Sequence, residues 1–371
     1  YKSSLSNPDQ TEALTSFENH PVRFLSSSDN NTLCFSYHGE IYTLSQGGSP
    51  EKLQVHIAAD GRNNLEKIVP VDGGFTEMKL SPNDKEFAYV FRGEIFVSSV
   101  EGGITRRITN TPWQERSVSF SPDGRSLVYA AEKDTSWDVY TTSLVREEEP
   151  YFYVSTLLKE EVVVATGAEE FQPEFSPDGK EVAYLEDRKT LKVVNLESKQ
   201  SRMILPPELN YSYADGDQYY TWSPDGKWFL VQYVPSDRMF VREVGLVSSD
   251  GKGEVRNLTL SGYNDFGPKW VMDGKMMIWG SDRLGSRAQG DYSVNWDVYG
   301  LFFSQEAFDR FNLTKEEFAL LKEQEEEKEK KEKNSKDDEK SGKKGKKDNN
   351  GEEKQDEDRV EEIKIDWNNL T

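Results

Sequence analysis

The sequence predicts an all-β fold, a β-propeller of about six four-stranded blades with TolB- or WD-like repeats. Three observations predict it: a Ser-Pro-Asp-Gly turn recurs along the 371 residues, apolar runs follow the turns, and the spacing suits one blade per repeat. Four copies of the turn are strong, a fifth keeps the preceding aromatic residue and the Asp-Gly, and a sixth is weaker. The equivalent positions are Ser27, Ser81, Ser121, Ser176, Ser223 and Val271, at steps of 54, 40, 55, 47 and 48 residues.

The chemistry of the repeated turn is that of a tight hairpin between two strands. Proline pre-sets φ at the first corner, Asp bonds back to the turn backbone, and Gly accepts the positive φ. The apolar runs after the turns have the pattern of strands buried on both faces. They are residues 87–91, 127–130, 182–185, 228–231 and 276–279. A third and a fourth strand follow each run, and packing blades side by side buries faces that one blade alone leaves exposed.

The composition is that of a globular protein with an acidic surface. The chain is 35% hydrophobic and 12% aromatic, and it contains no apolar run long enough to span a membrane. The net charge is −21, and the low-complexity stretch 322–358, with 12 Lys and 15 Asp or Glu, accounts for only −3 of it. We therefore expect a soluble protein that binds neither nucleic acid nor membrane, in the cytoplasm or, as the alternative, in the periplasm.

Four segments organise the chain. Residues 1–303 are the expected propeller, and because residues 1–5 resemble the end of a third strand and Ala13–Thr15 a fourth, it starts within a blade. We thus expect the chain to be an excerpt of a larger protein. Residues 304–333 are a helical extension with a capping box at Thr314–Glu317. Residues 334–358 are a disordered charged tether. Residues 359–371 alternate like a strand that returns to the last blade, the alternative being a frayed tail or the start of the next domain.

The sequence offers no convergent catalytic constellation. The three histidines, His20, His38 and His56, are dispersed, and there is neither a metal-binding histidine pair on a helix nor a paired cysteine. There is also no nucleophile elbow and no phosphate-binding loop. We therefore predict no catalytic residue, no metal and no cofactor in this chain. The segment 280–286 is interpreted as a turn between two strands.

A tyrosine-rich loop is the candidate binding site. It spans residues 210–220 and carries Tyr211, Tyr213, Tyr219 and Tyr220. Loop tyrosines give a large contact area for peptides or protein partners at a low entropic cost. The alternative is that they fill the space between blades.

Several segments resemble the propeller region of bacterial tricorn-like proteases, a serine peptidase family. They are residues 20–25, 92–97, 115–129, 306–311 and 363–367, the last two separated by a charged tether. The resemblance implies that the propeller guides peptide substrates or products and docks on catalytic domains further along the same polypeptide, which could associate into a homo-oligomer. None of that catalytic core matches this chain. The alternatives are a stand-alone TolB-like protein-binding propeller and the gating propeller of a prolyl-oligopeptidase-like enzyme.

Overall fold

A computed structural model describes residues 1–56, 70, 73–133, 136–210, 218–235, 241–285, 295–341 and 362–368. The chain forms two compact units, Tyr1–Pro70 and Val71–Thr371. The sequence predicted one propeller over residues 1–303, followed by an extension. The units are described separately. In both, the described strands form antiparallel sheets whose strand order follows the chain, and the predicted all-β fold of propeller-type blades is confirmed.

The first unit contains a hairpin and one four-stranded sheet. The hairpin pairs β1 (Lys2–Ser4) with β2 (Asn7–Glu12), and the sheet contains β3 (Arg23–Ser27), β4 (Leu33–Tyr37), β5 (Glu40–Leu44) and β6 (Glu51–Lys52). The strand expected at Ala13–Thr15 is wrong, because the chain turns back after Ser4 and pairs immediately. The weak sixth turn is also shifted by one residue: Ser28, not Ser27, contacts Asn30 and accepts the N–H of Thr32.

The described residues of the second unit form five sheets, which are numbered in chain order. Sheet 1 consists of β7 (Phe75–Leu80), β8 (Glu86–Phe91), β9 (Glu94–Ser99) and β10 (Thr105–Arg107). Sheet 2 consists of β11 (Glu115–Phe120), β12 (Ser126–Lys133), β13 (Ser136–Leu144) and β14 (Leu158–Val164). Sheet 3 consists of β15 (Glu170–Phe175), β16 (Glu181–Glu186), β17 (Thr190–Asn195) and β18 (Ser201–Leu205). Sheet 4 consists of β19 (Tyr220–Trp222), β20 (Trp228–Tyr233), β21 (Glu243–Ser248) and β22 (Arg256–Asn257), and sheet 5 of β23 (Asp265–Val271), β24 (Met276–Ser281) and β25 (Asp297–Phe302).

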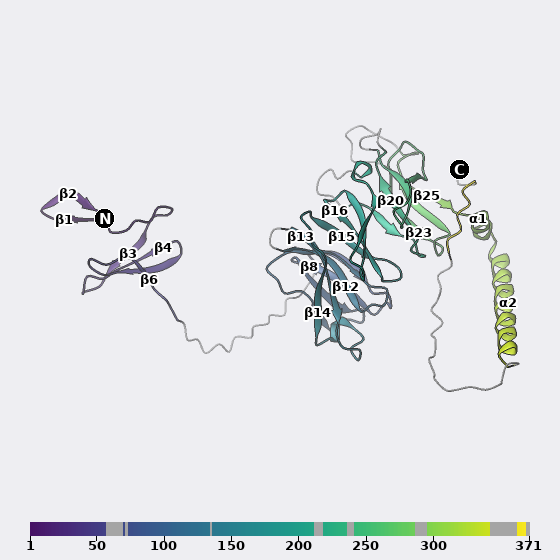
Figure 1. The fold of residues 1–371 in the computed structure, drawn as a ribbon, viewed down its shortest axis with the longest axis horizontal. Helices are drawn as coiled ribbons and strands as arrows, with labels where there is room; N and C mark the ends of the chain where they lie inside the picture. The colour runs from purple at the N-terminus through teal and green to yellow at the C-terminus, as the bar shows by residue number, and fades with distance from the viewer. Residues whose placement is uncertain are drawn as a thin grey trace. The chain divides into compact units, whose positions relative to one another are not determined.

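The sheets follow one another in space as they do in the chain (Figure 1). β11 packs beside both β7 and β15, so the first strands of neighbouring sheets lie next to each other. The apolar core lies between the sheets. One cluster joins sheets 1 and 2 around Leu127, another joins sheets 2 and 3 around Tyr184, and further clusters surround Phe229 and Met277. Because each cluster needs residues from two sheets, a single blade could not bury it alone.

The repeated turn joins the first and second strands at one end of the sheets, here called the turn end. In sheet 3 the Ser176 hydroxyl donates to Asp178 Oδ1 at 2.6 Å and accepts the N–H of Glu181 at 3.0 Å. Ser81, Ser121 and Ser223 make the same pair of bonds. Gly179 has φ +69°, and a side chain there would lie 3.5 Å from Cδ of Pro122 in the preceding turn. Consecutive turns therefore contact each other along the turn end.

Two helices and a returning segment follow the last sheet. α1 (Gln305–Phe311) is capped by Ser304 Oγ, which accepts the N–H of Ala307 at 3.2 Å. α2 (Lys315–Ser341) begins with the expected capping box, in which Thr314 N–H donates to Glu317 Oε2 at 2.8 Å. α2 extends eight residues past the predicted helix end at 333. Residues 342–358 of the tether lie outside the described residues. Residues 362–368 form no strand and lie on sheets 4 and 5. Short 3₁₀ turns occur at η1 (Phe152–Val154) and η2 (Pro207–Leu209).

Candidate functional site: the bulged first strands

The first strands are interrupted by β-bulges four residues before the turn serine or its equivalent. The register shifts between Arg116 and Ser119 in β11, and the same shift recurs in β15 and β23. The bulge residues Ser117, Gln172 and Gly267 have φ values of +58°, +48° and +59°. A bulge re-aims a side chain and frees backbone groups from the ladder. The end of the sheets at which the first strands begin is here called the bulge end.

The freed backbone groups are satisfied by side chains from the neighbouring sheet. The N–H of Ser117 donates to Glu77 of sheet 1, and the N–H of Gly267 donates to Gln232 of sheet 4 at 3.2 Å. The side chain of Gln172 exchanges two hydrogen bonds with the backbone of Gln218, at 2.9 and 3.0 Å. The bulges thus lock adjacent sheets in register, because a buried peptide group without a partner is costly.

A polar surface follows from the bulges on the first strands. We call it the inner-strand surface and define it by Lys79, Ser117, Gln172, Glu174 and Tyr219. Burial raises the pKa of Glu174, and the charge of Lys79 lowers it in part. Burial also raises the pKa of Tyr219, and the nearby charge of Glu174 adds to that effect. The surface therefore combines a carboxyl group, a distant ammonium group and a phenol in a partly water-excluded place.

The structure separates the four candidate tyrosines into different environments. Tyr211 and Tyr213 lie outside the described residues. Tyr219 precedes β19 at the bulge position and is only partly buried. Tyr220 packs edge-to-face on Phe229, and its hydroxyl donates to the carbonyls of Gln172 and Ala183 in sheet 3. Tyr220 thus fills space between blades, whereas Tyr219 faces the inner-strand surface.

A second feature of the bulge end is a set of buried carboxylates that the sequence analysis did not single out. A hydroxyl residue stands four positions before an acid that opens a first strand, and it donates to that acid. The pairs are Thr111 with Glu115, Thr166 with Glu170, and Ser261 with Asp265. The sequence does contain a pattern for these pairs: an acid stands six residues before the turn position, and a Thr or Ser stands ten residues before it. Three copies among short, common residue types were too few to notice without the contacts.

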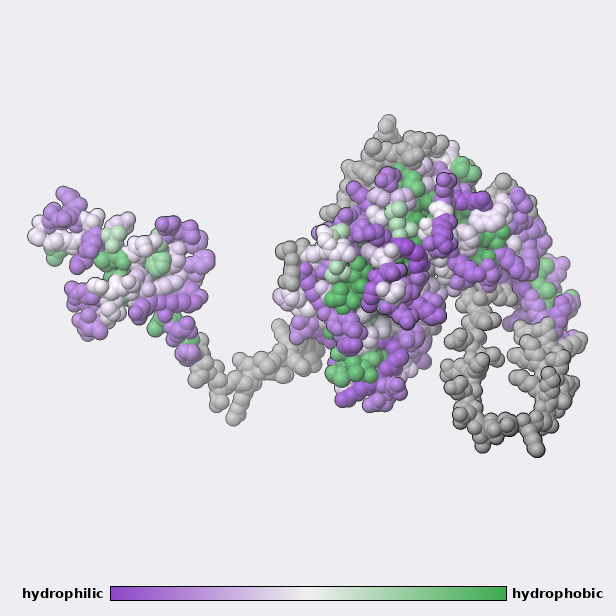
Figure 2. Space-filling view, in the orientation of Figure 1, coloured by the Kyte–Doolittle hydropathy of each residue, from purple (hydrophilic) through white to green (hydrophobic). Residues whose placement is uncertain are grey.

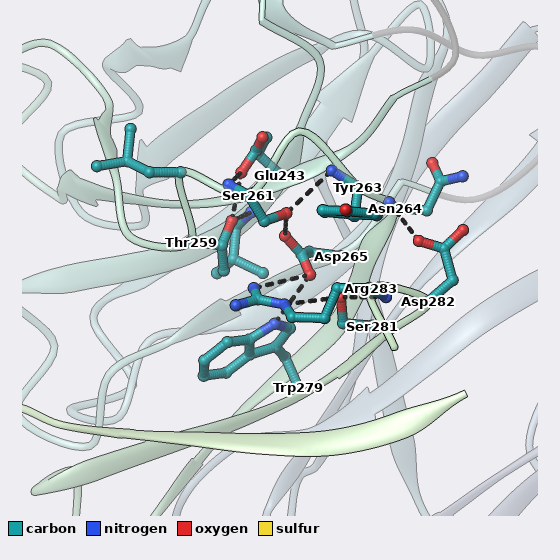
Figure 3. Close-up of polar contacts among 12 residues, drawn as sticks. Glu243, Thr259, Ser261, Tyr263, Asn264, Asp265, Trp279, Ser281, Asp282 and Arg283 are labelled. Carbon is teal, nitrogen blue, oxygen red and sulfur yellow. Dashed lines mark hydrogen bonds and ion pairs between the residues drawn. The ribbon is translucent and has the colours of Figure 1, made fainter. Parts of the chain in front are cut away.

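The cluster at sheets 4 and 5 shows how the carboxylates are used (Figure 3). Asp265 is fully buried, and it accepts the indole N–H of Trp279 at 3.1 Å and lies 3.4 Å from Arg283. Arg283 also stacks over Tyr299, 4.6 Å from the ring centre. Glu243 accepts the Thr259 hydroxyl at 2.6 Å and the N–H groups of the following loop at 3.0 and 2.7 Å. These acids hold the loop that leads from one sheet to the next.

Burial changes the titration of these acids. It raises the pKa of Glu115, against the hydrogen bonds from Thr111 and Thr109. It raises the pKa of Glu170 to about 7, against hydrogen bonds from Thr166, and the neighbouring Asp138 raises it further. Glu170 Oε2 is buried and finds no hydrogen-bond partner among the described residues. The Glu170 carboxyl can therefore hold a proton near neutral pH. The hydroxyl that donates to it belongs to Thr166, on the loop that leads from β14 into β15, so we assign this carboxyl a structural role.

The described residues contain no group of three or more His, Cys, Asp or Glu side chains that could hold a metal ion. His20 and His38 stack on each other, with ring centres 4.9 Å apart. Within the described part of the chain, no helix is both long and apolar enough to cross a membrane. On the face shown in Figure 2, hydrophilic residues dominate the described surface, and hydrophobic ones form small separate groups.

Comparison with known proteins returns fold neighbours only. No family model matches the sequence, and no curated protein does. Among solved structures, the tricorn protease is 15% identical over 78% of this chain, which spans 27% of that protein, with a TM-score of 0.47. An oligogalacturonate lyase from Vibrio parahaemolyticus is 14% identical, with 73% and 71% of the chains covered and a TM-score of 0.43. TolB from Acinetobacter baumannii is 17% identical, with 75% and 59% covered and a TM-score of 0.40.

Proposed function

We propose that this chain is the non-catalytic β-propeller portion of a tricorn-like serine protease. In this proposal its inner-strand surface guides peptide substrates or products, and catalytic domains elsewhere in the same polypeptide perform hydrolysis. The localisation that goes with this proposal is the cytoplasm. The resemblance of residues 20–25, 92–97, 115–129, 306–311 and 363–367 to that family motivates the proposal.

The observation that carries the proposal is where one element of the chain begins and ends. This helix–tether–return element runs from α1 through the charged tether to the returning residues 362–368. The ring of Phe302 contacts Phe308 and Phe311 of α1, with ring centres 5.4 and 5.2 Å apart. The carbonyl of the next residue, Phe303, accepts the N–H of Asp366 at 2.7 Å. Both ends of the element thus contact the chain at or just after the end of β25. Residues 306–311, the charged tether and residues 363–367 are among the segments in which the sequence resembles tricorn-like proteases.

The inner-strand surface supports a role in peptide handling. An unfolded peptide presents backbone donors and acceptors, and it needs a surface with polar groups and a flat apolar face. Glu174 supplies a polar group, and Tyr219 supplies the ring. The surrounding bulges are fixed by contacts between sheets, so the surface is rigid before any peptide arrives.

The first test separates the chain from the enzyme. The chain and the longest natural polypeptide that contains it are incubated with a mixed peptide library and with a serine-directed fluorophosphonate. We expect cleavage and labelling of the longer polypeptide only. Labelling of a serine in the chain itself would contradict a non-catalytic propeller, and a longer polypeptide that neither cleaves nor is labelled would favour the TolB-like binding propeller.

Replacing Tyr219 by alanine is expected to weaken binding of an unfolded peptide by about 3- to 10-fold, which corresponds to losing one aromatic contact. The melting temperature should change little, because Tyr219 is only partly buried. Tyr220→Phe is the matched control: it removes the hydroxyl bonds to sheet 3, so it should cost about 1 kcal/mol of stability and leave peptide binding unchanged. Peptide binding is measured by fluorescence anisotropy and stability by thermal unfolding. Unchanged binding by Tyr219→Ala would remove the inner-strand surface from the proposal.

A further inference from the structure

Neighbouring sheets meet at four equivalent places at the turn end, and we call these places grooves 1 to 4. Each groove is marked by the Pro of one repeated turn, which lies within 3.9 Å of the Cβ position of the next turn's Gly, and by the Asn or Asp that follows this Pro. These pairs of Asn or Asp with Gly are Asn83 with Gly124 for groove 1, Asp123 with Gly179 for groove 2, Asp178 with Gly226 for groove 3, and Asp225 with Gly274 for groove 4.

Groove 1 is filled by the connection between β13 and β14. Phe152 is fully buried there and packs edge-to-face on Phe120, with ring centres 6.1 Å apart. The N–H of Tyr153 donates to Glu86 Oε1 at 3.1 Å. This short segment therefore supplies one apolar anchor and one backbone donor to the groove.

Groove 3 is filled by a side chain. Arg202 of β18 forms two hydrogen bonds with the carboxylate of Glu181, both at 2.6 Å. Its Nε donates to the carbonyl of Ser249 in the turn after β21, at 2.8 Å. The arginine thus connects sheets 3 and 4.

Groove 4 is filled by the returning segment. Ile363 is buried and its N–H donates to Asp225 Oδ2 at 3.0 Å. Its side chain lies against Gly274, where a Cβ would collide with it. Four residues later, Trp367 packs on Trp228 and under Arg256, whose guanidinium lies 4.0 Å from the ring centre. The segment binds as an extended peptide would, through a backbone donor, a β-branched anchor and a distal side chain.

Groove 2, between sheets 2 and 3, is open. It forms a cavity of about 780 Å³. The groups that hold the segment in groove 4 have counterparts here. Phe175 and Trp270 both stand four residues before the turn Gly. Leu196 and Phe303 both donate their N–H to the carbonyl after that Gly, at 3.0 Å. Phe175 and Leu196 line the cavity together with Gly179 and Asp123.

One position differs in charge. Beside groove 4, Arg256 of the fourth strand pairs with Leu246 of the third strand, and Leu246 pairs with Leu230 of the second strand. Beside groove 2, the equivalent position on the fourth strand is Glu161, which pairs with Thr141 of the third strand. Glu161 is exposed and forms an ion pair with Lys159, also exposed, at 2.9 Å; such a pair contributes little. Asp123 and Asp178 add negative charge to the lining, against the one Lys199. A basic side chain therefore suits the position that Trp367 occupies in groove 4.

We infer that groove 2 is a docking site for an extended, basic peptide of another polypeptide. The peptide places a β-branched apolar residue against Gly179, Phe175 and Leu196. Its N–H at that residue donates to Asp123, and a Lys or Arg four residues later faces Glu161. The inference is independent of the proposed function, because it uses neither Tyr219 nor any other residue of the inner-strand surface.

The test uses two fluorescein-labelled pentapeptides, Ile-Ser-Ile-Ser-Lys and Ile-Ser-Ile-Ser-Glu, both acetylated and amidated, with anisotropy measured on the whole chain. The lysine peptide should bind at least about tenfold more tightly than the glutamate peptide at low ionic strength. Glu161→Lys should reverse this preference, and Val162→Arg, on the exposed wall of the cavity, should abolish binding. Glu147→Lys, an exposed charge reversal in the connection between β13 and β14, should change neither affinity by more than about twofold.

Two results would overturn the inference. One is a lysine peptide whose dissociation constant exceeds about 1 mM or is unaffected by Glu161→Lys. The other is preferential binding of Glu-Ile-Lys-Ile-Asp-Trp, the sequence of residues 362–367, which would make the occupant a second copy of this chain. Tyr219→Ala serves as the separating control, since it should leave binding of the pentapeptides unchanged even where it weakens binding at the inner-strand surface.

Discussion

Phe152→Ala is expected to lower the free energy of unfolding by about 3–5 kcal/mol, because it empties a fully buried site that cannot collapse around a smaller side chain. Phe152 belongs to the apolar cluster that joins sheets 1 and 2, together with Phe120, Leu127 and Ile95. It is the only residue of η1 that is buried, so the anchoring of that segment depends on it. Without the ring, the contacts of η1 with β9 and β10 should loosen.

The measurement is urea or thermal unfolding of the variant beside the unchanged chain. Val154→Ala, two residues away and 43% exposed, is the matched control and should cost less than about 1 kcal/mol. If the two variants were equally stable, Phe152 would not be a plug of groove 1, and the equivalence of the four grooves would lose one of its members. A large loss for Phe152→Ala alone would instead support Phe152 as the side chain that fills groove 1.

The blades could be predicted from the sequence because the chemistry of the turn repeats. Each turn serine uses its hydroxyl twice, once toward the Asp or Asn and once toward the next strand, so the residue pattern and the backbone geometry are tied together. Where the pattern weakens, the prediction failed by one residue, as at Ser28, or placed a strand too late, as in the hairpin of β1 and β2. In the latter case no side-chain signal distinguishes Asn7–Glu12 from a loop.

The contents of the grooves could not be predicted in the same way, because they are not repeated. Phe152, Arg202 and Ile363 come from a loop, a fourth strand and a distant segment, and no common spacing marks them, although the return of residues 359–371 to the last blade was expected. The bulges are equally hidden, since Ser117, Gln172 and Gly267 have nothing in common except a position four residues before the turn. The loop tyrosines were visible, but only the contacts of Tyr220 with sheet 3 separate it from Tyr219.

The stability of the second unit should fall as the pH rises from 5 to 8, and Glu170→Gln should remove much of that fall. In the folded chain the pKa of Glu170 is about 7, above its ordinary value of 4.5, because the carboxyl is buried and faces Asp138. Between these two values the folded state binds a proton that the unfolded state has released. Stability from this group is therefore fully present below the ordinary pKa and is lost as the pH rises through about 7.

The size of the effect follows from the shift, at roughly 1–3 kcal/mol between pH 5 and 8. Glutamine resembles the protonated acid: it can accept the hydroxyl of Thr166 and donate toward Asp138 without carrying charge. The variant should therefore gain stability relative to the unchanged chain at pH 8 and show little difference at pH 5. A residual slope should remain, because burial also raises the pKa of Glu86 to about 6.

The experiment compares chemical denaturation at pH 5, 6, 7 and 8 for the chain, Glu170→Gln and Glu169→Gln, the last being an exposed neighbour that changes the same charge. Parallel stability curves for the chain and Glu170→Gln would show that the acid titrates in its ordinary range, and the desolvated environment inferred at the start of β15 would be wrong. A flatter curve for Glu170→Gln alone would instead show that protonation of this carboxyl stabilises the packing of sheet 3 against sheet 2. Thr166 lies on the loop that leads from β14 into β15, and Gln172 lies on β15. Ionisation of Glu170 would then loosen the start of the strand that positions Gln172 on the inner-strand surface.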